Sequence, residues 1–241
     1  MKRVMVIALV VVCACAAKRR SVMPGGRCAP AGTLIAGVYV LGLAADPSNV
    51  YYHDEYTNTV WRVSKTGGAP APLMELDPDS FAVMAVDATQ VYVAALEPPA
   101  PNSTALPPAR IYAVSKNGGT RALIAENIVR PTALTADDAY LYWISNGTVE
   151  RARKDGSRRE TVGAAAPVIE VPSNAIESTL RIRDGRAYFL TSDDTLSFLP
   201  LAGGARTSLP QPPLGWSAFD VDSCAGYFAT LADELVAARL P

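Results

Sequence analysis

The stretch LYWISNGTVERARKDGSRRETV, residues 141–162, contains apolar segments separated by the pairs Asn146-Gly147 and Asp155-Gly156. Asn-Gly and Asp-Gly are the strongest sequence signals for two-residue hairpin turns, because both central positions of such a turn need a positive φ angle. Together with the apolar residues Ala133 and Leu134 just before it, the stretch predicts four consecutive antiparallel strands. These strands contain residues 133–134, 140–144, 148–153 and 159–162.

Related stretches recur along the chain, and each is marked by an aspartate that a tyrosine follows four or five residues later. The pairs are Asp46 and Tyr51, Asp87 and Tyr92, Asp137 and Tyr142, Asp184 and Tyr188, and Asp222 and Tyr227. The tyrosines are 41, 50, 46 and 39 residues apart. A period of this length in strand-like sequence is typical of the blades of a β-propeller.

The other copies predict strands in the same order. A Ser-Lys-x-Gly-Gly turn is shared by Ser64–Gly68 and Ser115–Gly119, which makes the first two copies the most alike. The predicted strands are 41–45, 50–53, 59–64 and 72–76; 82–86, 91–95, 110–115 and 121–125; 179–182, 187–191, 195–199 and 206–209; and 218–221, 226–230 and 234–238. We therefore expect an all-β propeller of five four-stranded blades, or of six if the irregular segment 164–178 contains further strands.

The fifth copy contains only three strands, and the chain start offers the missing one. Residues Gly32–Ala36 align with Thr120–Ala125, the outer strand of the second copy. We expect this N-terminal strand to complete the last blade, because closure removes exposed strand edges. Cys28 and Cys224 would then lie at the same end of that blade, where a disulfide would link them; the alternative is a pair of free thiols.

The first residues have the features of an export signal. Met1-Lys2-Arg3 is a charged start, Val4–Val12 is apolar, and residues 1–17 form the predicted leader, followed by a linker over 18–31 and the propeller over 32–241. The residues that end at Cys15 match a bacterial lipobox, which predicts a lipid on Cys15 and a place at the cell envelope.

One alternative and one contrary observation apply to this N-terminus. An ordinary cleaved signal without lipid would give a secreted protein. The basic run Lys18-Arg19-Arg20 argues against both readings, because positive charge after the apolar stretch resists translocation.

The stretch 141–162 resembles the YWTD repeats of the low-density lipoprotein receptor class. Its matching residues are Tyr142-Trp143-Ile144-Ser145 and the turn Arg153-Lys154-Asp155-Gly156-Ser157. The resemblance covers residues 32–241 and implies a propeller, which has six blades in that family. The Thr-Asp half of the motif is replaced here, so only the geometry of the repeat is carried over. The chain also resembles exported bacterial propellers, and that resemblance implies no activity.

The recurring aspartates and tyrosines are predicted to be structural. An aspartate in a turn accepts hydrogen bonds from nearby backbone N–H groups, and a tyrosine packs between blades with its hydroxyl at the rim. The net charge of -1 includes five basic residues among the first twenty, so the rest of the chain is mildly acidic. This argues against nucleic-acid binding, which rests on basic residues. One histidine, His53, does not supply the ligand sets of catalytic zinc sites, so no metal and no other cofactor is expected.

A candidate binding rim combines two connections between second and third strands. One is the run His53-Asp54-Glu55-Tyr56, predicted to be a solvated turn, although its three polar groups could also bind a cation or transfer a proton. The other is the proline-rich insertion Leu96–Ala109, which includes Pro98, Pro99, Pro101 and Asn102. Loops on a rigid scaffold are common binding sites.

The sequence favours a monomeric, non-enzymatic binding or scaffold propeller that presents this rim to a protein or glycan partner, with the membrane reached only through the lipid. A small-molecule hydrolase or lyase that uses the central channel is the main alternative. The starts of the predicted first strands, where such enzymes place polar groups, are Leu41, Ala82, Thr132, Thr179 and Ser217. A structural subunit of an envelope complex is a third possibility.

Overall fold

The computed structural model describes residues 35–77, 82–96, 107–129, 131–165, 180–190, 195–209, 216–221, 225–230 and 235–239. The strands within these ranges form five antiparallel sheets, and each strand pairs with its neighbours in sequence. Four of the sheets have four strands, and the fifth has three. The predicted all-β fold of four-stranded meanders is thereby confirmed.

We call the sheets blades one to five in chain order. Blade one contains β1 (Val40–Ala45), β2 (Asn49–Asp54), β3 (Thr59–Ser64) and β4 (Ala71–Glu75). Blade two contains β5 (Ala82–Val86), β6 (Gln90–Leu96), β7 (Ala109–Ser115) and β8 (Ala122–Ile128). Blade three contains β9 (Pro131–Ala136), β10 (Tyr140–Ser145), β11 (Thr148–Arg153) and β12 (Glu160–Ala164).

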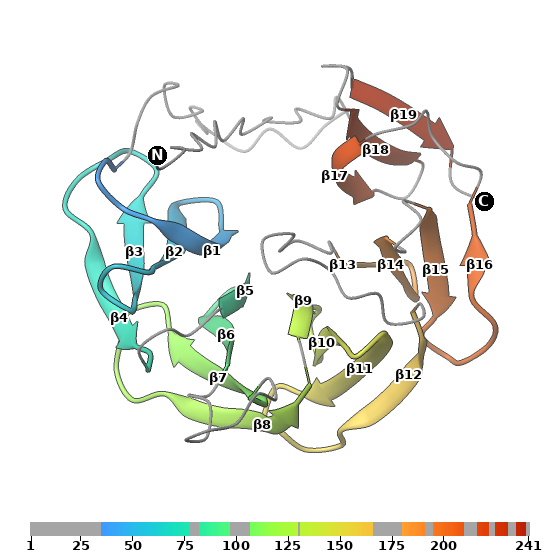
Figure 1. Ribbon diagram of the computed structural model, residues 1–241, viewed down its shortest axis with the longest axis horizontal. Coiled ribbons are helices and arrows are strands. Elements are labelled where there is room, and N and C mark those ends of the chain that lie inside the picture. Colours follow the sequence, from blue (N-terminus) through green and yellow to red (C-terminus); the bar gives the residue numbers. More distant parts are fainter. Residues whose placement is uncertain are drawn as a thin grey trace, which may run out of the picture. The chain divides into compact units, whose positions relative to one another are not determined.

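Blade four contains β13 (Leu180–Arg183), β14 (Arg186–Leu190), β15 (Leu196–Pro200) and β16 (Thr207–Ser208). Blade five contains β17 (Trp216–Val221), β18 (Ala225–Thr230) and β19 (Leu235–Arg239). The first strands of successive blades contact one another: β1 with β5, β5 with β9, β9 with β13, and β13 with β17 (Figure 1). This stacking of meanders through their first strands is the arrangement of a β-propeller.

Apolar side chains fill the space between successive blades. Second strands are buried on both faces, so Tyr51 of β2 packs toward blade two while Val91 and Val93 of β6 pack toward blade one. Tyr92 and Trp143 meet in the same way between blades two and three. Because alternate residues of a strand point to opposite faces, a largely apolar second strand is what a blade covered on both sides requires.

Blades one and two approach each other closely at Gly42 of β1. A Cβ atom at this position would lie 2.4 Å from the carbonyl oxygen of Ala82 in β5. Only a residue without a side chain fits here, because a backbone atom cannot move aside as a flexible side chain can. Gly42 thus sets how closely blades one and two pack at their first strands.

Two-residue turns occur where the sequence signals them most clearly. Asn146 and Gly147 have φ angles of 47° and 72°, and Asp184 and Gly185 have 47° and 72°, as a type I′ turn requires. The Asp155-Gly156 turn differs from the prediction of a two-residue hairpin. It is longer, since the N–H of Arg153 donates to the carbonyl of Ser157 and β12 begins at Glu160.

Several predictions fall outside the described residues. These are the leader and linker with Cys15, the possible disulfide between Cys28 and Cys224, and most of the segment 164–178. The predicted closing strand is described only at Ile35 and Ala36, which are not in a strand. The number of blades and the closure by the N-terminus therefore stay predictions.

Candidate functional site

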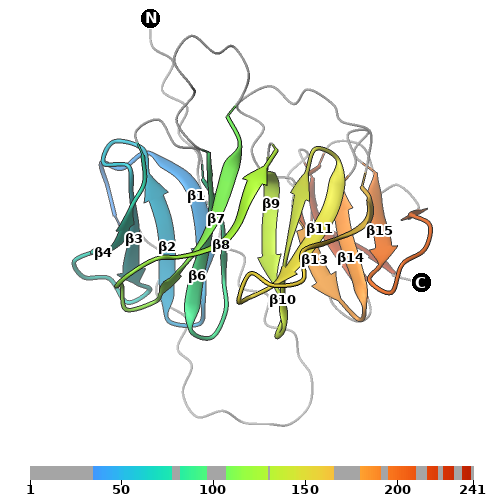
Figure 2. The same cartoon turned by 90° about the horizontal axis from the view of Figure 1, so that it is seen from below.

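The strands of blades one to three run between two ends, as Figure 2 shows for β2, β6 and β10. We call the end that holds the turns of Asp46, Asp87 and Asp137 the aspartate end. The connections from second to third strands lie at the other end, which we call the insertion end. They are the turn Glu55–Asn58, the connection from Leu96 to Ala109, and the turn Asn146-Gly147.

At the aspartate end, Asp46, Asp87 and Asp137 have the same contacts. The Oδ1 atom of each accepts the backbone N–H groups two and three residues later, at distances of 2.7 and 2.8 Å. Each Oδ2 atom accepts the hydroxyl of the tyrosine five residues later, at 2.8, 2.8 and 2.7 Å. The structural role that the repeat predicts for these aspartates and tyrosines is confirmed in blades one to three.

Two lysines extend this motif from one blade to the next. The Nζ atom of Lys116 in blade two lies 2.6 Å from Oδ2 of Asp46 in blade one. Lys154 of blade three lies 2.8 Å from Oδ2 of Asp87 in blade two. Both lysines come from turns between third and fourth strands, so these turns and the aspartate turns lie at the same end, as antiparallel pairing demands.

These contacts shift the pKa of both the aspartate and the tyrosine of the motif. Burial alone would raise the pKa of Asp46, but the hydrogen bonds from Lys116, from two backbone N–H groups and from Tyr51 hold that pKa well below its usual range. The pKa of Asp87 is lowered in the same way, with Lys154 as the main donor. Burial and the neighbouring carboxylate raise the pKa of Tyr51 and Tyr92, which therefore stay neutral donors.

Blade four departs from the motif. Asp184 lies in the two-residue turn with Gly185, four rather than five residues before Tyr188, and Nη1 of Arg186 lies 3.4 Å from the hydroxyl of Tyr188. Leu201 stands where Lys116 and Lys154 stand in the earlier blades, and it packs in the core between blades three and four. Asp222 of blade five lies outside the described residues.

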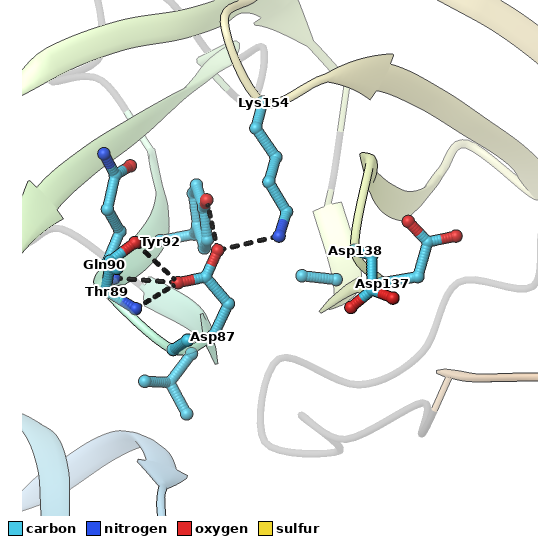
Figure 3. A pocket seen from close by; sticks show the side chains of 10 residues that line it. Asp87, Thr89, Gln90, Tyr92, Asp137, Asp138 and Lys154 are labelled. Atoms are coloured by element: carbon cyan, nitrogen blue, oxygen red, sulfur yellow. Dashed lines mark hydrogen bonds and ion pairs between the residues drawn. The ribbon is translucent and has the colours of Figure 1, made fainter.

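A cavity of about 540 Å³ opens at the aspartate end between blades two and three (Figure 3). Lys154 and Asp87 meet on one side of it, and Asp137 and Asp138 lie on the other. Asp137 is already held by two N–H groups and the Tyr142 hydroxyl. The polar groups of this cavity thus serve mainly to fix turns and join blades, and they leave little for a ligand.

The insertion end of blade one exposes two aromatic side chains. Tyr56 is 73% exposed and Tyr39 is 51% exposed. Their ring centroids lie 6.0 Å apart with the planes tilted by 60°. An exposed pair of this kind is available for contact with a partner, and tyrosine is enriched in protein interfaces because its ring is large, rigid and has a polar tip.

A buried carboxylate holds both tyrosines in place. Asp54 is only 4% exposed, and its Oδ1 atom accepts the N–H groups of Tyr39 at 3.1 Å and Tyr56 at 3.3 Å. Its Oδ2 atom accepts the hydroxyl of Thr57 at 2.9 Å, and Thr57 in turn accepts the indole N–H of Trp61. The pair is therefore fixed on a rigid turn rather than carried by a free loop.

His53 differs from its predicted place. It was expected on a solvated turn, but it lies in β2 and is fully buried, opposite Gly42 and Val60. Because paired residues share a face, His53 points toward blade two with them. Neither ring nitrogen has a hydrogen-bond partner among the described residues, and burial lowers the pKa of the imidazole although Asp54 opposes this.

Of the predicted rim, Glu55 and Tyr56 are exposed as expected, whereas His53 and Asp54 are buried. The flanks of the proline-rich insertion agree with the prediction, since Leu96 ends β6 and pairs with Ala109 at the start of β7. Pro98, Pro99, Pro101 and Asn102 lie outside the described residues. Tyr39 had no signal in the repeat, because it precedes the first strand.

The described part of the chain contains no group of three or more histidine, cysteine, aspartate or glutamate side chains that could hold a metal ion. Within that same part, no helix is long and apolar enough to cross a membrane.

No family model matches the sequence, and no curated protein matches it either. Among solved structures, a chain of the nidogen/laminin complex aligns with a TM-score of 0.63 and 18% identity, over 84% of this chain and 76% of that chain. The computationally designed protein Ika4 aligns with a TM-score of 0.45 and 11% identity, over 70% of this chain and 98% of that one. The first match agrees with the propeller fold that the resemblance to YWTD repeats implies.

Proposed function

We propose that this protein is a binding propeller whose partner is another protein, and that it docks through the insertion end of blade one. The observation that carries the proposal is the exposed pair Tyr39 and Tyr56, fixed by the buried carboxylate of Asp54. The hydrogen bonds to Asp54 order the backbone that carries both tyrosines. A backbone that is already ordered lowers the entropy cost of binding.

The fold supports the same proposal. A structure with this fold was solved in the nidogen/laminin complex, so such a propeller can take part in an assembly of proteins. At the aspartate end, Asp87, Asp137 and Lys154 are engaged in turns and an ion pair, so they are not free to act as acid and base for a hydrolase or lyase. We therefore favour binding over catalysis.

The location that we propose for the protein in the cell rests on its N-terminal sequence. We propose that the export signal and the lipid on Cys15 hold the propeller at a bacterial cell envelope, where it meets its partner. A permanent structural subunit of an envelope complex would use the same surface, and would differ in how long the partner stays bound.

Affinity capture with matched variants tests the proposal. Wild-type protein, Tyr56→Ala and Val129→Ala are immobilised side by side, because Val129 is another exposed apolar residue, 50% exposed, in blade two. Val129 directly follows β8, the last strand of that blade. We expect one protein to be retained by the wild type and by Val129→Ala and to be lost with Tyr56→Ala. Equal capture by all three proteins, or no captured protein, would refute a protein-binding role for this surface.

A further inference from the structure

We infer that the surface around Tyr39 and Tyr56 receives a basic segment of the partner, with an arginine side chain against the tyrosine rings. This inference rests on the proposed function and adds the chemistry of the partner. It is carried by the charges around the pair and by the way that this chain uses arginine elsewhere.

The described charges around the tyrosine pair are acidic. Glu55 precedes Tyr56 in the turn, and Glu75 and Asp77 run beside that turn, because the N–H of Leu76 donates to the carbonyl of Asn58 at 2.7 Å. All three carboxylates are exposed. The stretch 35–58, which supplies both tyrosines, contains no lysine or arginine. The field at this surface therefore favours a cation.

An arginine of blade two approaches this surface and is already engaged in other contacts. Arg121 of blade two donates from Nη1 to the carbonyl oxygen of Glu75 at 3.0 Å. Its guanidinium also lies over the ring of Tyr112, 4.4 Å from the centroid. Its hydrogen bond goes to a backbone carbonyl and its plane covers a different ring. Among the described residues, no ion pair involves the carboxylates of Glu55, Glu75 or Asp77.

Other aromatic rings of the chain are covered by a cation. Arg151 lies 4.8 Å from the ring centroid of Tyr140, Arg159 lies 5.7 Å from that of Trp143, and Arg186 lies 4.7 Å from that of Phe198. In the described ranges, no lysine or arginine lies over the ring of Tyr39 or Tyr56. A cation at these two rings would therefore come from the partner.

Arginine fits this surface better than other cations do. Its planar guanidinium stacks on an aromatic face and donates hydrogen bonds to carboxylates at the same time. Tyr56 offers the face and the neighbouring Glu55 offers the carboxylate. The rings of Tyr39 and Tyr56 are tilted by 60°, so they do not form one flat platform.

The test uses the full chain and a fluorescent peptide of alternating arginine and serine, with binding followed by anisotropy. We expect Tyr56→Ala and Glu55→Lys each to weaken the affinity at least about fivefold, whereas Tyr56→Phe keeps it, because the ring face and not the hydroxyl attracts the cation. Leu123→Ala is the matched control, since Leu123 is 50% exposed in blade two. Binding should also weaken as the salt rises from about 0.05 M to about 0.5 M.

The outcomes separate this inference from the proposed function. If the captured partner depends on Tyr56 but neither the peptide nor the partner responds to Glu55→Lys or to salt, the partner is not basic at this surface and the inference fails while the function stands. Equal peptide binding by Tyr56→Ala and Leu123→Ala also overturns it. If replacing Lys18, Arg19 and Arg20 by alanine strengthens peptide binding at least about fivefold, the chain's own basic run is the occupant and the inference is wrong.

Discussion

The ammonium group of Lys154 lies 2.8 Å from the carboxylate of Asp87, and this contact joins the outer half of blade three to the inner turn of blade two. The same carboxylate orders its own turn and the hydroxyl of Tyr92. One charged group thus fixes a turn, a core tyrosine and the neighbouring blade. Lys116 and Asp46 repeat the arrangement one blade earlier.

This ion pair is expected to stabilise the fold. Replacing Lys154 by Met should lower the free energy of unfolding by about 1 to 3 kcal/mol, because it leaves a largely buried carboxylate without its charged donor. In a double-mutant cycle with Asp87→Asn, the two losses should not add, and the coupling should be about 1 kcal/mol. Urea denaturation measures both. A coupling of zero would show that the pair does not join the blades.

The close approach at Gly42 gives a second prediction. Gly42→Ala would place a Cβ atom 2.4 Å from the carbonyl oxygen of Ala82, so β1 and β5 must separate. We expect it to cost about 1 to 3 kcal/mol of stability, as overpacking does in other cores. Gly163→Ala is the matched control, because its new Cβ would meet the end of the Leu199 side chain at 3.2 Å, and a side-chain end shifts more easily than a backbone oxygen. Equal losses in the two variants would contradict this packing.

The buried histidine makes stability depend on pH. The pKa of His53 is lowered in the folded protein, so the unfolded chain binds a proton more readily as the pH falls below about 6.5. The stabilisation is present above that pH and is lost below it, by up to about 1.4 kcal/mol per pH unit until the folded pKa is reached. Thermal unfolding of the wild type and of His53→Leu between about pH 7 and about pH 5 measures this. Equal slopes for the two proteins would refute it.

The predicted closure of the propeller gives a fourth test. A disulfide between Cys28 and Cys224 would constrain nearly the whole chain, and in the chain-entropy model it would contribute about 4 to 5 kcal/mol. Exported protein should therefore show no free thiol from these two residues in non-reducing mass spectrometry, and reductant should lower its midpoint of thermal unfolding. Two free thiols in exported material would rule the disulfide out.

The strands were predictable because turn chemistry and spacing are local. Asn146-Gly147 marks its hairpin, and the Asp–Tyr spacing of five residues marks the turns of Asp46, Asp87 and Asp137. The Lys154–Asp87 contact joins residues 67 positions apart, so no local pattern reports it. A lysine directly after the third strand recurs in the first three copies, as Lys65, Lys116 and Lys154, and was the available signal.

The candidate site was only partly predictable for a similar reason. The polar groups of His53, Asp54 and Glu55 predict a turn, yet β2 continues through Asp54, so the first two residues lie within the strand and are buried. The sequence predicts a strand that ends at residue 53, one residue before the observed end, and strand ends are hard to place from sequence. Tyr39 joins Tyr56 only through the pairing of β1 with β2, which brings the residue before one strand beside the end of the other.

The most direct test of a protein-binding surface at Tyr39 and Tyr56 is site-specific photo-crosslinking. A photoreactive amino acid replaces Tyr56 in one protein and Asp138 in another, because Asp138 is exposed at the aspartate end. Both are illuminated in the cells that make the protein. We predict one discrete crosslinked protein from position 56 and none of that mass from position 138. The same adduct from both positions, or an adduct from position 138 alone, would contradict it.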